Sequence, residues 1–153
     1  MSDVHSPEIR SKNMAAVRAS NTKPEVFVRS MLHRAGFRFT LKTKKLPGKP
    51  DIYLPKFNAV IFVHGCFWHG HDCHLFKWPK TREEFWRSKI TGNRLRDLKV
   101  DEEIEEVGVR SAVVWECALR GKARRGDEYL LKELGGWLKS NQAKLVVSGL
   151  KYD

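Results

Sequence analysis

Residues 63–74, VHGCFWHGHDCH, hold four histidines and two cysteines within twelve positions. Imidazole nitrogens and thiolates are the ligands that zinc prefers in proteins. The third cysteine of the chain, Cys117, lies far along the sequence, just after the apolar run SAVVW. Three cysteines do not suit a disulfide framework, and their clustering with histidines favours a metal site.

A structural zinc site needs four ligands in a tetrahedron, and Cys66, Cys73 and Cys117 can supply three thiolates. The candidates for the fourth ligand are the nearby histidines His69, His71 and His74. Spacing alone does not choose among them, since positions 69, 71 and 73 share one face of an extended segment. Because Cys117 follows an expected strand, zinc would fasten the loop to the sheet. The alternative is a set of buried free cysteines beside surface histidines.

If zinc takes four of these side chains, a second set of polar side chains is left over, which includes His64, His69 and Asp51. Asp51 stands at the start of an expected strand in LPGKPDIYL, where its carboxylate could hold a hard cation such as Mg²⁺. A histidine can accept a proton from water near neutral pH. Hydrolysis of a phosphodiester uses this pairing of a cation and a base. Taken alone, Asp51 could equally be an ordinary turn residue.

The charge balance indicates the class of partner. Lysine and arginine outnumber aspartate and glutamate by 29 to 18, giving a net charge of +11 over 153 residues. Such an excess favours a nucleic acid, although a solubilising surface is the simpler alternative. The sequence has no apolar run approaching the length of about 18 residues that a membrane-spanning helix needs. The polar start MSDVHSPEIRSK leads us to expect a cytosolic protein without a membrane contact.

The hydrophobic pattern predicts strands interleaved with helices, hence an α/β or α+β sheet with helices on both sides. Capping boxes begin two of the helices, with Thr22 and Glu25 in one and Thr81 and Glu84 in the other. The expected helices cover residues 6–17, 22–35, 81–90, 93–107 and 128–139. The expected strands are FRFTLK, PDIYL, AVIFV as a central strand, SAVVW and KLVV. The inward positions of the 93–107 helix are Leu95, Leu98, Ile104 and Val107.

Longer motifs resemble one known family. LPGKPDIYLPKFNAVIFVHGCFWHGHDC, followed by TREEFW and VVWECALRG, is similar to the very-short-patch repair (Vsr) endonucleases, bacterial enzymes that nick DNA beside a T:G mismatch. The similarity runs from RSKNM to ECALRG near residue 120. It implies a restriction-endonuclease-like α/β (α+β) core, with a mixed central sheet flanked by helices and a structural zinc site.

The resemblance also implies how the chain is organised. We expect one endonuclease domain over residues 1–153. Its N-terminal helical segment, about 6–20, would contact DNA, and its catalytic and zinc core would cover about 22–120. A C-terminal helix and strand would occupy 127–150.

The resemblance assigns roles to individual residues. Asp51 would bind Mg²⁺ together with the backbone carbonyl of Val63, and His69 would be the general base. His64 would assist at the phosphate, with Glu25 behind the metal and water. The zinc ligands would be Cys66, His71, Cys73 and Cys117.

The resemblance implies a set of DNA contacts as well. Phe67 and Trp68, joined by Trp86, would wedge into the base stack beside the mismatch, where a mispaired step unstacks at lower cost. Met14 would insert from the opposite groove, while Lys89 and Asn93 would read base edges. The alternative for Trp86 is packing between helix and sheet, and the alternative for Met14 is a contact between helices. The other tryptophans, assigned to the core, are Trp78, Trp115 and Trp137.

Two departures from the wider pattern are visible. The strand AVIFVHG has neither the second acid nor the lysine that the restriction-endonuclease superfamily usually carries after its first aspartate, which leaves one carboxylate for the cation. Gly70 stands where some relatives carry a histidine, and we expect this difference to cost little.

These observations predict a Mg²⁺-dependent, strand-specific endonuclease that cleaves 5′ to the thymine of T:G mismatches in double-stranded DNA. Deamination of 5-methylcytosine produces such mismatches, so a cytosine-5 DNA methyltransferase would be its genetic companion. General mismatch-repair proteins are further candidate partners, and the chain would act as a monomer. The alternatives are a restriction-type endonuclease that cuts matched sites and a non-catalytic zinc protein that binds DNA.

Overall fold

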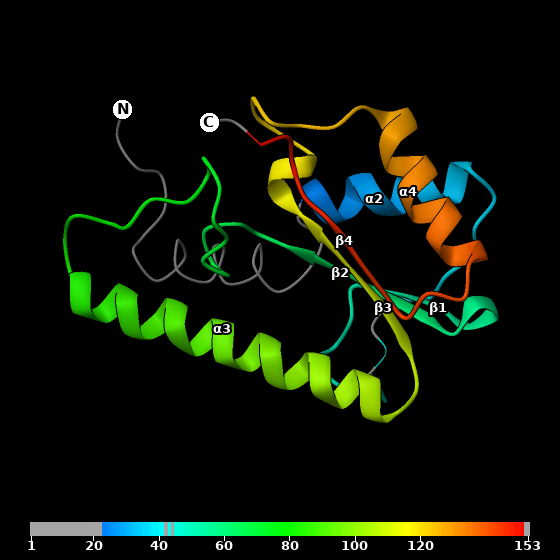
Figure 1. Ribbon diagram of the computed structural model, residues 1–153, viewed down its shortest axis with the longest axis horizontal. Coiled ribbons are helices and arrows are strands. Elements are labelled where there is room, and N and C mark those ends of the chain that lie inside the picture. The colour runs from blue at the N-terminus through cyan, green and yellow to red at the C-terminus, as the bar shows by residue number, and fades with distance from the viewer. Residues whose placement is uncertain (1–22, 42, 44, 152–153) are drawn as a thin grey trace, which may run out of the picture.

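The computed structural model describes residues 23–41, 43 and 45–151 of the chain (Figure 1). The helix expected at residues 6–17, and Met14 within it, lie outside these residues. The helices are α2 (Lys23–Arg34), α3 (Glu83–Glu106) and α4 (Asp127–Lys139), with short 3-10 turns at Pro55–Phe57 and Glu116–Ala118. The strands are β1 (Ile52–Leu54), β2 (Ala59–His64), β3 (Arg110–Trp115) and β4 (Lys144–Val147). No helix within the described ranges is long and apolar enough to cross a membrane.

The strands form one sheet in the order β1-β2-β3-β4. β1 pairs with β2 in antiparallel fashion, whereas β2–β3 and β3–β4 are parallel pairs. The sheet is therefore mixed, as expected. The run AVIFV forms most of β2, which lies inside the sheet, and its first four residues are buried. Parallel strands covered on both faces read as continuous apolar runs for this reason.

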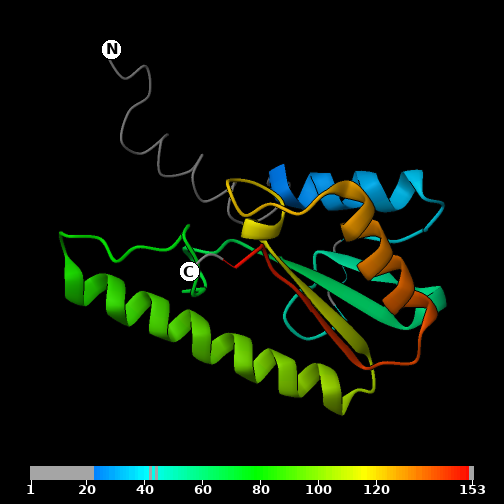
Figure 2. The same ribbon diagram turned by 45° about the horizontal axis from the view of Figure 1, so that its top comes forward.

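Helices cover both faces of the sheet, which confirms the predicted architecture. α2 and α4 lie on one face and the long helix α3 lies on the other (Figures 1 and 2). The larger core packs Val28 and Leu134 from the two shorter helices against Ile61 of β2. The smaller core packs Ile104 of α3 against Val60 and Phe62. Since side chains alternate along a strand, His64 belongs to the face that α3 covers.

Three local predictions were wrong. FRFTLK forms no strand in its described residues, where Thr40 makes a single bridge to Tyr53. The two helices expected at 81–90 and 93–107 are one helix, α3, because Gly92 adopts helical geometry and merely lowers local helix propensity. α3 begins after Arg82, which has a left-handed backbone and no side-chain cap; Thr81 therefore does not cap it.

The apolar face predicted for the second half of α3 was also wrong in part. Ile104 is buried, but Leu95, Leu98 and Val107 are 63%, 63% and 55% exposed. Leu98 lines a cavity between the helix and the strands, whereas the neighbouring Val100 packs against the smaller core. The apolar position at Leu98 therefore belongs to a cleft wall and not to a core contact.

Candidate active site and metal centre

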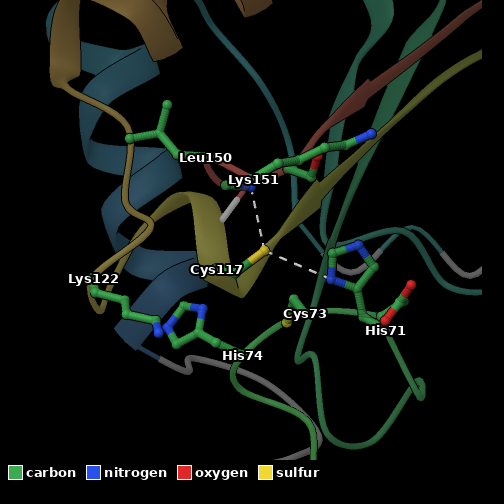
Figure 3. A pocket seen from close by; sticks show the side chains of 10 residues that line it. His71, Cys73, His74, Cys117, Lys122, Leu150 and Lys151 are labelled. Atoms are coloured by element: carbon green, nitrogen blue, oxygen red, sulfur yellow. Dashed lines mark hydrogen bonds between the residues drawn. The ribbon is translucent and has the colours of Figure 1, made fainter. Parts of the chain in front are cut away.

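Four metal-ligating side chains come together beside the sheet. Three lie on the loop from β2 to α3, and the fourth lies in the 3-10 turn after β3. We call this set the cysteine cluster, and its members are Cys66, His71, Cys73 and Cys117. One ligand atom from each lies within 4.8 Å of the others. His71 Nδ1 is 3.5 Å from Cys66 Sγ and 3.6 Å from Cys117 Sγ. Figure 3 shows Cys117 and His71 approaching from separate segments of the chain. The cluster could hold a metal ion.

Backbone amides already point at the sulfur atoms of this cluster. The N–H of Cys117 donates to Cys66 Sγ, and the N–H of Gly149 donates to Cys117 Sγ, both at 3.3 Å. Burial raises the pKa of the Cys66 thiol and of the Cys117 thiol, which these hydrogen bonds only partly oppose. A bound cation would stabilise the thiolates that burial alone disfavours.

His74, the last histidine of the loop, lies outside the cysteine cluster. It lines a cavity of about 530 Å³ beside the cluster (Figure 3). Its Nε2 is buried and makes no hydrogen bond to any described residue. Of the three histidines that the sequence left open as zinc ligands, the structure thus groups His71 with the cysteines.

A second cavity, of about 670 Å³, opens between α3 and the sheet. We call it the cleft. Asp51 lines it, and Asp51 Oδ2 accepts a hydrogen bond of 2.6 Å from the backbone N–H of Val63. Burial raises the pKa of Asp51 to about 6, and the negative charge of Glu25 adds to this effect. Glu25 is itself 6% exposed on α2, 3.6 Å from Arg29. A carboxyl whose pKa is raised by a neighbouring acid, as that of Asp51 is by Glu25, is suited to sharing a cation with it.

His64 and His69 line the same cleft. Their rings are stacked, with centroids 3.9 Å apart, and His69 Nδ1 lies 2.6 Å from Asp97 Oδ2. Asp97 projects from α3, so the helix fixes the orientation of the His69 ring. Burial, and then the neighbouring His69, lower the pKa of His64 to about 4. His64 is therefore neutral at pH 7 and can donate one hydrogen bond while accepting another.

Trp115 separates the cleft from the cysteine cluster. Its ring stacks on His71 at a centroid distance of 4.0 Å and an interplanar angle of 8°. The same ring lies 5.2 Å from the ring of His64 and 6.0 Å from that of His69. Sequence reasoning assigned Trp115 to the core. In the structure it is half-buried and touches both groups of ligands.

A tight turn beside Asp51 closes one end of the cleft. Gly48 has φ +76°, and a Cβ there would lie 2.3 Å from Val100 of α3, so this close approach needs glycine. The next residue, Lys49, has φ +49° and lines the cleft, as do Arg94 and Arg96. Positive side chains therefore surround the acids and histidines, which suits a phosphate backbone.

The loop that carries His69 is tied to α3. Asn93 Nδ2 donates to the carbonyl of Trp68 at 2.8 Å, and the Arg94 guanidinium donates to the carbonyl of Gly70. Gly70 has φ +61°, and a Cβ there would lie 2.6 Å from Ile90 Cγ2. The expectation that this difference from some relatives costs little stays a prediction, while any side chain here would require Ile90 and Arg94 to shift.

The aromatic residues of the loop form one cluster with α3. The ring of Phe67 lies 5.2 Å from that of Trp68 and 5.3 Å from that of Trp86, and the two tryptophan rings are 5.8 Å apart. All three side chains are half-buried, and Lys89 is exposed one turn further along α3. The structure thus brings the predicted wedge residues together. The ring contacts of Trp86 are to Phe67 and Trp68 of the loop and to Phe85 of α3, and not to the sheet as the alternative had it.

Two contributors to the cleft escaped the sequence analysis. Asp97 lies in a helix rich in both acidic and basic residues, so its type alone did not single it out. Its i, i+4 spacing from Asn93 was the one signal that it shares the helix face turned to the loop. Trp115 was read as core because it ends an apolar strand. Its register opposite His64 in the parallel pair β2–β3 could have indicated its place.

Comparisons with known proteins agree on one family. The family model described as DNA mismatch endonuclease Vsr matches residues 2–75. The chain is 45% identical to the DNA mismatch endonuclease Vsr of Escherichia coli over 138 residues, covering 90% of this chain and 88% of that protein. It is 50% identical over 119 residues to the type II nicking enzyme V.XorIIP of Xanthomonas oryzae, covering 78% and 88%. It is 46% identical over 123 residues to the type II nicking enzyme V.NmeAIP of Neisseria meningitidis, covering 80% and 88%.

Proposed function

This chain belongs to the Vsr family of DNA mismatch endonucleases, and on that premise we propose that it nicks one strand of double-stranded DNA 5′ to the thymine of a T:G mismatch. The observation that carries the proposal is the shared cleft, in which Asp51, His64 and His69 face one cavity among cationic side chains. A phosphate of the DNA backbone would lie there.

Magnesium is the cation we propose for Asp51. The carboxylate oxygens of Asp51, with Glu25 behind it, are the hard ligands that Mg²⁺ prefers, and the backbone carbonyl of Val63 would be a further ligand. The negative charge of Glu25, which raises the pKa of Asp51, supports this assignment. When bound, Mg²⁺ would neutralise charge on the scissile phosphate and lower the pKa of a bound water.

His69 would take the proton from the attacking water, while Asp97 holds its ring in place through the 2.6 Å contact to Nδ1. With Nδ1 held by Asp97, Nε2 of His69 would be the nitrogen that accepts the proton. His64 is uncharged at pH 7, so it would assist by donating a hydrogen bond to a phosphate oxygen and not by supplying a positive charge. Arg94 and Arg96 would orient the strand.

Zinc is the ion we propose for the cysteine cluster. With zinc–sulfur bonds of about 2.3 Å and zinc–nitrogen bonds of about 2.0 to 2.1 Å, a tetrahedron has sulfur–nitrogen edges of about 3.6 Å. The sulfur–nitrogen distances of 3.5 Å and 3.6 Å from His71 to Cys66 and Cys117 support this fit. Four protein ligands leave no open position, which is typical of a structural site.

Phe67, Trp68 and Trp86 are the proposed wedge at the mismatch, because large rings that lie together on one loop and helix can stack on unpaired bases. Lys89 and Asn93 are the proposed readers of base edges, although Asn93 also holds the Trp68 carbonyl. Met14, outside the described residues, would insert from the other groove.

The proposed cellular setting follows from the substrate. T:G mismatches arise where 5-methylcytosine deaminates, so the enzyme would accompany a cytosine-5 DNA methyltransferase in the bacterial cytosol, at the nucleoid. We propose that it acts as one endonuclease domain and as a monomer, and that it hands the nicked strand to general mismatch-repair proteins.

The test compares three duplexes of one sequence, carrying T:G, T:A or C:G at the same position. We expect a nick 5′ to the mismatched thymine in Mg²⁺, no nick in EDTA, and no cleavage of either matched duplex. Asp51→Ala should lower the nicking rate about a thousandfold, since a lost metal ligand removes several kcal/mol of stabilisation. Its DNA binding should survive. Asp127→Ala, which removes an exposed acid on α4, is the matched control.

The same experiment decides against the alternatives. Cleavage of both strands of a matched duplex would establish a restriction-type activity instead. Binding of the T:G duplex without cleavage in any divalent cation would indicate a non-catalytic zinc protein. An undiminished rate for Asp51→Ala would overturn the proposed metal ligand.

A further inference from the structure

His64, His69 and Asp97 form a group that the magnesium site at Asp51 does not use as ligands. One ligand atom from each lies within 4.8 Å of the others. They come from three segments: the end of β2, the loop after it, and the middle of α3. All three side chains are half-buried and line the open cleft, so an ion could reach them from solvent.

The donor set differs from that of Asp51 in chemical type. Two imidazole nitrogens and one carboxylate suit the borderline cations Zn²⁺, Co²⁺ and Ni²⁺, whereas Mg²⁺ prefers oxygen alone and binds histidine poorly. We propose that His64, His69 and Asp97 form a second cation site, selective for transition-metal dications, inside the cleft. Its effect on nicking rests on the proposed function, but the binding itself does not.

The geometry requires only small side-chain movements. A single ion bonded at about 2.0 to 2.2 Å holds its ligand atoms at most about 4.2 Å apart, slightly closer than the limit found here. Rotation of the His69 ring and of Asp97 would replace their mutual 2.6 Å contact with two bonds to the ion. Waters in the cleft would complete the coordination.

Occupation of this site would stop hydrolysis. An ion on Nδ1 of His69 leaves the ring proton on the other nitrogen, so the ring has no lone pair left to accept a proton from water. An ion on Asp97 removes the contact that orients the ring. Because Mg²⁺ and the transition-metal ion use different ligands, raising Mg²⁺ would not displace the inhibitor. Zinc would therefore stabilise the protein at the cysteine cluster and inhibit it at the cleft.

The binding test uses the full chain with one zinc ion per molecule at the cysteine cluster, checked by elemental analysis, in Mg²⁺-free buffer. Co²⁺ is titrated while its visible absorption is recorded. We expect one additional Co²⁺ per chain, with nitrogen and oxygen ligation and without the near-ultraviolet band of a cobalt–thiolate bond. Retention of the zinc shows that Co²⁺ has not entered the cysteine cluster.

Variants locate the ion. Asp97→Asn and His64→Gln should each weaken Co²⁺ binding at least about tenfold, in line with the effect of losing a ligand or its partner. His33→Ala, which removes an exposed histidine on α2, should leave the affinity unchanged. Circular dichroism confirms that each variant is folded. Absence of the second Co²⁺, a thiolate band in its spectrum, or wild-type Co²⁺ affinity in both cleft variants would overturn the site.

Nicking of the T:G duplex at saturating Mg²⁺ gives the second readout. Zinc beyond one equivalent should lower the rate at least about tenfold, and further Mg²⁺ should not restore it. Full activity with the second cation bound would overturn the inhibition. If wild type fails to nick even without excess zinc, the proposed function fails, while the cobalt spectra still decide the cation site.

Discussion

On one side of Trp115, the four ligand atoms of the cysteine cluster face one another, whereas on its other side Asp51, His64 and His69 face an open cavity. Both groups depend on the same loop after β2. In the cysteine cluster, the sulfur atoms of Cys66 and Cys117 receive backbone hydrogen bonds, and His71, Cys73 and Cys117 line the smaller cavity. The cleft is walled by α3, β2 and the turn at Gly48, and its polar groups are left for a substrate.

One loop can therefore hold a shape and still present reactive groups. If a metal ion binds all four ligands of the cysteine cluster, as proposed, it would restrain the backbone between Cys66 and Cys73. His69 lies within that stretch, and its Nδ1 is 2.6 Å from Asp97 Oδ2 on α3. A reactive imidazole held in one orientation needs no reorganisation when the substrate binds.

We expect the largest loss of stability when a ligand of the cysteine cluster is removed. Cys117→Ser should abolish zinc retention and cost more than about 4 kcal/mol of unfolding free energy, because loss of a structural metal is among the most damaging single changes. Zinc per chain and urea unfolding measure the two effects.

His74→Ala is the matched control for this variant, since it removes a neighbouring histidine outside the cluster. It should keep one zinc per chain. A Cys117→Ser protein of wild-type stability, or one that is zinc-free and folded like wild type, would contradict a structural role for the metal.

In the open site, burial of two titratable groups should produce opposite pH dependences of stability. Folding raises the pKa of Asp51 from 3.8 to about 6, so its contribution to stability is present below pH 4 and is lost as the pH rises through 6. Folding lowers the pKa of His64 from 6.5 to about 4, so its contribution is present above pH 6.5 and is lost as the pH falls through 4. Each reaches at most about 3 kcal/mol.

Unfolding of zinc-loaded protein in Mg²⁺-free buffer separates the two groups. Relative to wild type, Asp51→Asn should gain stability as the pH rises from 4 to 6.5, and His64→Gln should lose it. Because both variants keep the cysteine cluster, the pH dependence of that cluster cancels in the comparison. Parallel curves for wild type and both variants would show that neither group is buried as described.

Asp97→Asn should sharpen the distinction between orienting and binding. We expect the single-turnover nicking rate to fall about tenfold to a hundredfold, as when a partner of a functional histidine is lost. The dissociation constant for the T:G duplex should change little. Asp101→Asn, one turn further along α3, is the control, because Asp101 pairs with Lys144 and not with a histidine. A loss of DNA affinity equal to the loss of rate would assign Asp97 to binding instead.

The smallest effects concern two glycines that differ in surroundings. Gly70→Ala should destabilise by at least about 1 kcal/mol, since φ is +61° and the new Cβ would lie within 3 Å of Ile90 and Arg94. Gly92→Ala should stabilise by about 0.5 to 1 kcal/mol, because it lies within α3 and its Cβ would meet no described atom within 4 Å. Thermal unfolding of both variants compares them. The same sign for both would contradict the packing of the loop on α3.

Several features of the fold were readable from local patterns. The run AVIFV predicted a central strand, because a strand buried on both faces is apolar at every position. SAVVW and KLVV were also predicted as strands, while their parallel pairing, β2 with β3 and β3 with β4, came from the structure. The break in α3 was predicted wrongly because Gly92 and the polarity of its surroundings suggested an end. A helix of 24 residues continues through such a place when tertiary contacts at Ile90 and Ile104 hold its two halves.

The amino-acid sequence was enough to predict the kinds of chemistry present: thiolates and imidazoles at short spacing, one isolated acid before a strand, and an excess of basic residues. Those follow from residue types and their separation along the chain. Tertiary structure decided the division of the histidines, with His71 beside the cysteines and His69 beside Asp97. Residues 46 positions apart, such as His71 and Cys117, meet only when β2 and β3 pair, and no local pattern encodes which ring turns to which side of Trp115.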